Sequence, residues 1–408
     1  VITCWAMGIT QHKQAVATVQ EIANLHFLRG QIGRQGAGLC PVRGHSNVQG
    51  DRSMGIWEKM NPVFRENLEK EFHFKTPVKD GLDTVESIKA MHEGKAKVFF
   101  AVGGNFYSAT PDTEFTETAL RNCNLTTQVI TKLNRTALIT GKKSLILPCL
   151  GRTEIDMTGG KEQFVSTEST MLNVQMSKGV AEPASEHLRS EVWIIGKLAQ
   201  AVLKSKINFD WERMICDYDN IRDSISRVVA GCENYNQRIR QEDGFYMPNP
   251  PMERIFPTDT GKAKFKAGKL ERIELEAGQL LLTTIRSHDQ FNTTIYTEND
   301  RYRGIKGSRR VILMNKQDIA ERNLKQGEVV DITSYFTDKT RRAEGFIVVE
   351  YPIPKDCAAT YFPEANALVP IGSVAEKSNC PTSKLVKIMV APHLENGKKM
   401  FTGEFDNK

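Results

Sequence analysis

The chain has 408 residues, of which 40% are apolar and 25% are charged, and these proportions exclude wholesale disorder and collagen-like order. No uninterrupted apolar stretch reaches the roughly 18 residues of a membrane span, so none is predicted. The net charge is +6, but the basic residues are scattered along the chain. Scattered charge disfavours a nucleic-acid surface and is compatible with a bound polyanionic small molecule.

The eight cysteines stand at positions 4, 40, 123, 149, 216, 232, 357 and 380, and no two of them form a Cys-x-x-Cys pair. The spacing supports neither an iron–sulfur cluster loop nor a thioredoxin motif. We interpret them as buried free thiols of a reducing compartment and therefore expect a cytoplasmic protein. Because the chain opens on a strand-like run that begins at Val1, we expect the true N-terminus to lie upstream.

The first 150 residues predict an α/β domain. A buried strand is expected over residues 1–7, a helix over 11–29, an extended loop over 40–62, a helix over 84–93, and strands over 97–102, 126–131 and 144–149. Strand, glycine turn and helix in succession favour a parallel sheet with helices on its faces.

Residues 151–277 predict a helical and linker region that continues this domain. Helices are expected over 185–204 and 218–230, and a proline-rich linker at 247–252. After Gly278 the pattern changes to short β-rich runs, which lie at 280–284, 310–313, 329–333, 345–349 and 385–390, with one helical turn over 317–323. Several short strands separated by turns are typical of a compact β-barrel. Residues 278–408 are therefore expected to form a separate barrel domain.

Three segments could carry chemistry. Gly103-Gly104-Asn105 follows a strand, where backbone N–H groups can face a phosphate, although a tight strand-to-helix turn needs the same glycines. The loop from Gly30 to Gly55 is rich in polar donors and suits a polar ligand, but its His45 could equally be a satisfied loop histidine. Thr284-Ile285-Arg286 ends a strand with donors for phosphate, or with a structural arginine ion pair.

Eight short motifs, each present once, follow one another over almost the whole chain. They are WAMGITQH (5–12), LRGQIGRQGAG (28–38), PVRGHSNVQG (41–50), GGN (103–105), LP (147–148), TIR (284–286), FPEANAL (362–368) and SNCPTSK (378–384). As an ordered set they resemble the molybdopterin-dinucleotide oxidoreductases, specifically the branch that includes formate dehydrogenase. No Gly-x-Ser-x-Gly, Walker A or His-Glu-x-x-His motif points to another class.

The resemblance implies a parallel-sheet α/β domain followed by a C-terminal double-psi β-barrel, and a molybdenum bis(molybdopterin guanine dinucleotide) cofactor. The family's Gly-x-x-Gln turn, near the metal, corresponds to Gly8 and Gln11, and its Gly-Gly-Asn turn at the guanine dinucleotide to Gly104 and Asn105. From the barrel the resemblance implicates Thr284, Arg286, Gln290, Asn292, Asn366 and Lys384. We expect Arg286 and Lys384 to line one concave surface together with Gly104 and Asn105.

In the family, a 4Fe-4S cluster and the Cys or selenocysteine ligand of molybdenum precede the position of Val1, so no metal ligand or catalytic residue is assigned in this chain. A full-length member would carry out two-electron redox chemistry on a small molecule, with an electron-transfer protein as partner, whereas these 408 residues alone are expected to be catalytically silent. Residues 130–135 depart from the family's usual acidic, threonine-rich run, so formate is not assigned as substrate. The alternative is a non-catalytic binding module that keeps the fold without metal.

Overall fold

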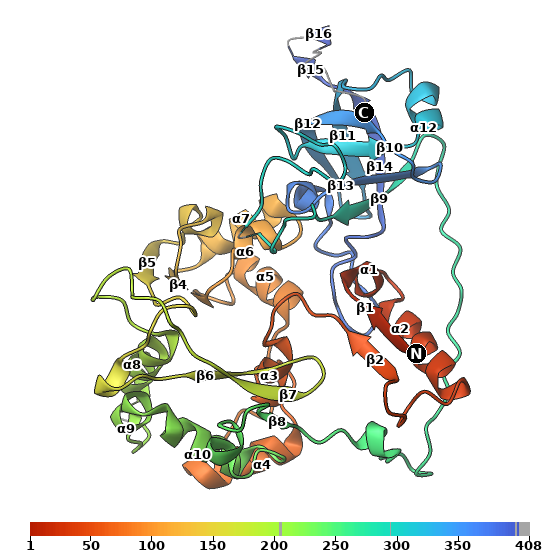
Figure 1. The fold of residues 1–408 in the computed structure, drawn as a ribbon. Coiled ribbons are helices and arrows are strands. Elements are labelled where there is room, and N and C mark those ends of the chain that lie inside the picture. The colour runs from red at the N-terminus through yellow and green to blue at the C-terminus, as the bar shows by residue number, and fades with distance from the viewer. Residues whose placement is uncertain (204–205, 294, 396–397, 400–408) are drawn as a thin grey trace.

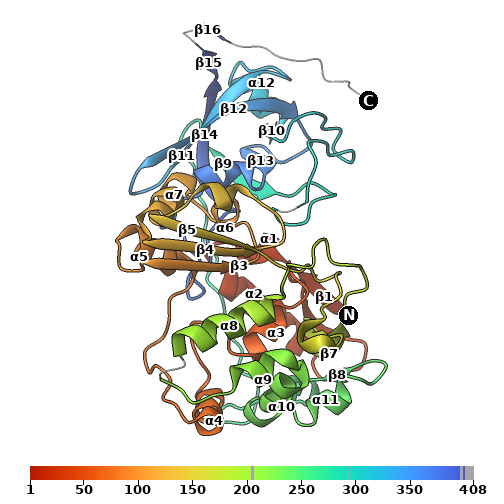
Figure 2. The same ribbon diagram turned by 90° about the vertical axis from the view of Figure 1, so that its left-hand side faces the viewer.

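The computed structural model describes residues 1–203, 206–293, 295–395 and 398–399, so the last nine residues of the expected barrel domain lie outside it. A β-barrel forms one end of the molecule, and helices α8 to α10 form the other (Figure 1). After a 90° turn, the strands β3, β4 and β5 are seen to lie between these two ends (Figure 2). No helix in the described ranges is long and apolar enough to cross a membrane.

Four elements open the chain: β1 (Ile2–Trp5), α1 (Met7–Thr10), α2 (Ala15–Leu28) and β2 (Gly38–Pro41). β1 and β2 pair in parallel, and α2 covers one face, where the Thr3 hydroxyl lies 2.5 Å from Nε2 of buried His26. Cys4 points to the opposite face and is exposed. The expectation that residues 1–7 are buried is therefore wrong, because in the described part of the chain this strand has one neighbouring strand and one covered face.

The next elements are α3 (Val48–Ser53), α4 (Pro62–Phe72), α5 (Thr84–His92), β3 (Val98–Val102), α6 (Phe106–Ala109), α7 (Thr113–Asn122), β4 (Leu125–Ile130), η1 (Arg135–Leu138) and β5 (Lys143–Pro148). β3, β4 and β5 form a parallel sheet in that order, as predicted. α5 and α7 pack together through buried Ile88 and Leu120. The extended loop expected over 40–62 is partly wrong, because α3 lies inside it; six residues are too few for hydrophobic periodicity to reveal a helix.

The region before the barrel contains η2 (Thr158–Gly160), β6 (Val165–Glu168), β7 (Asn173–Ser177), α8 (Glu191–Leu203), α9 (Trp211–Cys216), α10 (Tyr218–Val228), α11 (Tyr235–Arg238), β8 (Phe245–Tyr246) and η3 (Pro250–Glu253). α8 and α10 agree with the two expected helices. The antiparallel sheet β6–β7–β8 was not predicted. Its strands are only two to five residues long, and their burial does not alternate regularly.

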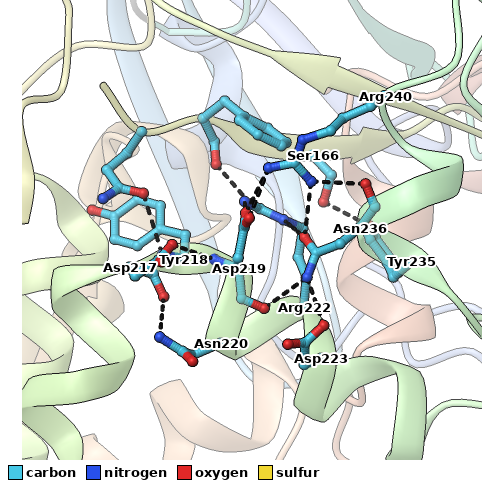
Figure 3. Close-up of polar contacts among 12 residues, drawn as sticks. Ser166, Asp217, Tyr218, Asp219, Asn220, Arg222, Asp223, Tyr235, Asn236 and Arg240 are labelled. Carbon is cyan, nitrogen blue, oxygen red and sulfur yellow. Dashed lines mark hydrogen bonds and ion pairs between the residues drawn. The ribbon is translucent and has the colours of Figure 1, made fainter. Parts of the chain in front are cut away.

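A buried arginine ties α10 to β6 and α11 (Figure 3). Arg222 donates to Oδ1 of Asn236 at 2.7 Å and to the Phe164 carbonyl at 2.9 Å, and its guanidinium carbon lies 3.8 Å from the centre of the Phe164 ring. It also pairs with Asp219, which Arg240 binds at 2.8 Å. Burial alone would raise the pKa of Asp219, but hydrogen bonds from Arg240 and Arg222 outweigh it and lower that pKa.

The connection from η3 to the barrel runs along α2 (Figure 1). Nδ2 of Asn24 donates to the Lys266 carbonyl at 2.8 Å, and Glu21 accepts from the Gly268 amide at 2.5 Å. These contacts hold an extended segment against the N-terminal unit, so the proline-rich linker expected at 247–252 extends well beyond those residues.

The barrel region contains β9 (Leu280–Ile285), β10 (Val311–Met314), α12 (Lys316–Glu321), β11 (Val329–Tyr335), β12 (Thr340–Glu350), β13 (Cys357–Tyr361), η4 (Glu364–Leu368) and β14 (Val386–Pro392), followed by the hairpin β15 (Leu394–Glu395) and β16 (Lys398–Lys399). Six strands close in the order β10–β12–β11–β14–β9–β13. Leu280, Leu282 and Ile312 are fully buried inside. The β-barrel is confirmed, whereas its double-psi connectivity stays a prediction. β13 escaped notice because Cys-Ala-Ala-Thr is a weak strand signal.

Candidate functional site

Residues from three distant segments meet where β1 and β9 end. Nη2 of Arg286, which directly follows β9, lies 3.9 Å from Sδ of Met7, and Nε2 of Gln11 lies 3.8 Å from the same sulfur. The Lys384 amide donates to the Gln11 carbonyl at 3.2 Å. The Lys384 ammonium donates to the Thr284 carbonyl and, at 3.1 Å, to its Oγ1. We call these five residues the cation corner.

Among the described residues, the two cations of this corner have no acidic partner within ion-pair distance. No carboxylate of the described residues forms a salt bridge with Arg286 or Lys384, although both side chains are half-buried. Burial, and secondarily the charge of Arg286, lowers the pKa of Lys384 to about 8. Burial also lowers the pKa of Arg286. Because desolvated charges without a counter-charge are unfavourable, the corner is suited to bind an anion such as a phosphate group.

The depressed pKa of Lys384 makes anion binding depend on pH. The ammonium is charged below a pH of about 8 and loses its proton above it. We therefore expect the affinity of the chain for sulfate, whose charge stays constant, to fall as the pH rises from about 7 to about 9. Calorimetric titration of the wild type and of Lys384→Arg, which keeps its charge, tests this. Equal pH dependence in both proteins would contradict the assignment.

A second part of the site lies at the carboxyl ends of β3 and β4. A cavity of about 260 Å³ is lined by Gly103, Gly104, residues 130–135 and, from the barrel, Thr293 and Tyr296. Gly103 and Gly104 have φ values of 67° and 76°, a left-handed conformation that favours glycine. An added Cβ at either glycine meets no atom within 4 Å, so the cavity leaves the turn's backbone accessible to a ligand. We call it the Gly104 cavity.

Two of the residues expected to bind the cofactor form hydrogen bonds with other residues of the chain. Asn105 is buried, and its Oδ1 accepts from the Thr136 hydroxyl at 3.0 Å. Asn366 is also buried, and its Nδ2 donates to the Ser108 carbonyl at 2.7 Å. Asn366 therefore joins the barrel to α6. A direct contact of either side chain with the cofactor stays a prediction.

Gln290 and Asn292 lie in the loop after β9. The Gln290 oxygen accepts from Nη2 of Arg309 at 3.0 Å and its nitrogen donates to the Phe362 carbonyl at 2.7 Å, so this buried amide orders the loop. Asn292 has φ 48° and its Nδ2 lies 3.2 Å from Nε2 of His45. The loop after β2 thus reaches the barrel, a long-range contact that the sequence did not indicate.

The remaining polar loop lies at the surface. Nη2 of Arg43 donates to the Gln49 side chain at 2.9 Å, and Nη1 of Arg152 donates to the Ser46 hydroxyl at 3.2 Å. Gly8 is exposed in α1, and its carbonyl accepts from the His12 ring. These donors are therefore accessible to a polar ligand, and the charge of Arg43 also acts on buried Glu168, whose pKa it lowers against the larger effect of burial.

A single concave surface for Arg286, Lys384, Gly104 and Asn105 stays a prediction. Gly104 and Asn105 line the Gly104 cavity, whereas Arg286 lies against Met7 of α1 and Lys384 bonds to Thr284. The loop after β9 connects the two, since it begins at Arg286 and contributes Thr293 and Tyr296 to the Gly104 cavity. Met7 lies inside the motif over residues 5–12 but was not assigned a role, and Tyr296 lies outside every matched motif.

Two family models match the chain. The model described as "Molybdopterin oxidoreductase" matches residues 1–201, and the "Molydopterin dinucleotide binding domain" matches residues 280–388. The first contains the Gly104 turn and Gln11, and the second contains Arg286 and Lys384. Both matched ranges therefore contribute residues to the cation corner and to the Gly104 cavity.

Among curated proteins, "Uncharacterized oxidoreductase Rv2900c" of Mycobacterium tuberculosis is 51% identical over 397 residues, which are 96% of this chain and 51% of that protein. "Protein YdeP" of Escherichia coli K12 is 40% identical over 96% of this chain and 52% of its own length. "Putative formate dehydrogenase SAUSA300_2258" of Staphylococcus aureus is 26% identical over 85% of this chain and 36% of its own length. The chain thus spans about half the length of the first two relatives.

Among solved structures, acetylene hydratase from Pelobacter acetylenicus superimposes with a TM-score of 0.52 at 15% identity, over 83% of this chain and 50% of that protein. At this identity the likeness concerns the fold alone. The two family matches, the relatives and the fold agree with the motif order. The chain therefore belongs to the molybdopterin oxidoreductases, with a molybdopterin oxidoreductase domain over residues 1–201 and a molybdopterin dinucleotide-binding domain over residues 280–388.

Proposed function

We propose that the chain is the cofactor-binding portion of a molybdenum oxidoreductase that holds a bis(molybdopterin guanine dinucleotide) and acts on a small molecule. The observation that carries the proposal is the cation corner, whose two half-buried cations form no ion pair with a carboxylate in the part of the chain that the structure describes. A dinucleotide's phosphates supply the missing negative charge. One relative is named a putative formate dehydrogenase, but residues 130–135 depart from the family's usual run, so the proposal specifies only a small molecule as substrate, with electrons passing to a separate protein.

Each part of the site has a task in this proposal. Arg286 and Lys384 bind phosphate oxygens, and the backbone of Gly103 and Gly104 lies against the guanine-dinucleotide portion. The bound molybdenum would supply the two-electron redox chemistry. The chain's own residues hold and orient the organic cofactor and keep water from its charged groups. Its eight free cysteines support a cytoplasmic location.

The alternative is a non-catalytic module that keeps the fold without metal, and metal analysis separates the two. We expect the purified full-length protein that contains this chain to hold close to one molybdenum and two pterins per polypeptide, measured by elemental analysis and by fluorescence of the oxidised pterin. A 4Fe-4S cluster outside these residues would add iron and labile sulfide. Protein that is folded but holds neither molybdenum, tungsten nor pterin would support the module instead.

A further inference from the structure

A cysteine pair lies at the base of the site, on the two opening strands. Cys4 of β1 stands directly opposite Cys40 of β2 in the parallel register. Side chains alternate between the faces of a strand, and Thr3 points at His26 of α2, so both cysteines point away from that helix. Cys4 is exposed, and Cys40 is partly buried. Burial raises the pKa of Cys40, and so does the hydrogen bond that its thiol makes to the Cys4 side chain.

We propose that Cys4 and Cys40 form a reversible disulfide, a covalent modification site next to the cofactor-binding region. Neighbouring strands are about 4.8 Å apart, which lies within the usual range of about 4.4–6.8 Å for the Cα atoms of a disulfide. Because Cys4 is exposed, a bond formed there is open to reductants, as expected of a labile rather than a structural disulfide.

The oxidant is a small-molecule disulfide such as oxidised glutathione. The thiolate of exposed Cys4 attacks one glutathione sulfur, the glutathione S–S bond breaks, and one glutathione thiolate leaves. Cys40 then loses its proton and attacks the Cys4 sulfur, which forms the Cys4–Cys40 bond and releases the second glutathione. Two protein thiols are oxidised and one glutathione disulfide is reduced to two thiols, so electrons and atoms balance.

The location of the pair gives the modification a consequence for the site. Met7 of the cation corner follows Cys4 by three residues, and Arg43 of the polar loop follows Cys40 by three residues. A bond between Cys4 and Cys40 therefore fixes the two strands to each other immediately before both segments reach the site.

Peptide mapping of the full chain after incubation with oxidised glutathione tests the proposal. We expect the tryptic peptides that end at Lys13 and at Arg43 to become joined, with the loss of two hydrogens, and to separate again with a mild excess of dithiothreitol. Cys40→Ser should stop at a glutathione adduct on Cys4, because no second thiol can displace it. Cys123→Ser, which replaces a fully buried thiol, serves as the matched control and should not change the result.

Three outcomes would overturn the proposal. In the first, the wild-type protein stops at the glutathione adduct on Cys4. In the second, Cys4 becomes joined to a cysteine other than Cys40. In the third, neither Cys4 nor Cys40 reacts although circular dichroism shows that the protein is folded. Because Cys→Ser preserves size and strand propensity is little changed, loss of folding is not expected to obscure the comparison.

Discussion

Arg222→Ala is expected to lower the free energy of unfolding by about 3 kcal/mol. The substitution removes a guanidinium that is 4% exposed, leaves the Phe164 carbonyl without its side-chain donor, and leaves Oδ1 of Asn236 with only the longer bond from Arg240 at 3.3 Å. Each buried polar group that loses its partner costs about 1–3 kcal/mol. Asp219 keeps its pair with Arg240, which is why the loss stays below that of a fully orphaned buried charge.

Urea unfolding of the wild type and of two variants measures this effect. The control is Arg227→Ala on the same helix, whose guanidinium pairs with Glu71 but is 54% exposed. An exposed ion pair contributes about 1 kcal/mol or less, so the control should unfold near the wild-type midpoint. Equal losses in the two variants would contradict the role given to the network around Arg222.

Much of the fold could be predicted because its signals are local. The parallel strands β3 to β5 are marked by apolar runs with glycine turns between them, and the barrel strands β9, β10 and β11 by β-branched residues. α3 and β13 escaped because a six-residue helix shows no period and Ala-rich strands show little β preference. The prediction that residues 1–7 are buried was wrong. Burial of a strand depends on which other elements cover it, and the local sequence does not contain that information.

The site was only partly predictable for the same reason. Motif matching identified Gln11, Arg286 and Lys384, and the structure brings all three together at one corner. Met7 was missed because its contact with Arg286 spans 279 positions of sequence. No pattern of residue types encodes that proximity.

Arg286→Ala is expected to weaken cofactor binding by about 10- to 150-fold. A charge-assisted contact with phosphate is worth about 1.5–3 kcal/mol, and 1.36 kcal/mol corresponds to a tenfold change. Arg286→Lys should retain part of the binding, because an ammonium keeps the charge but cannot form the forked contact. The matched control is Arg301→Ala, which removes a guanidinium that is 70% exposed on the loop after β9.

The pterin content of full-length Arg286→Ala, measured beside that of Arg301→Ala, tests the central claim most directly. The claim is that the cation corner holds the phosphates of a molybdopterin dinucleotide. After identical purification and dialysis, the account predicts near-wild-type pterin per polypeptide in Arg301→Ala and a small fraction of it in Arg286→Ala, with both proteins folded. Full pterin content in folded Arg286→Ala would contradict it.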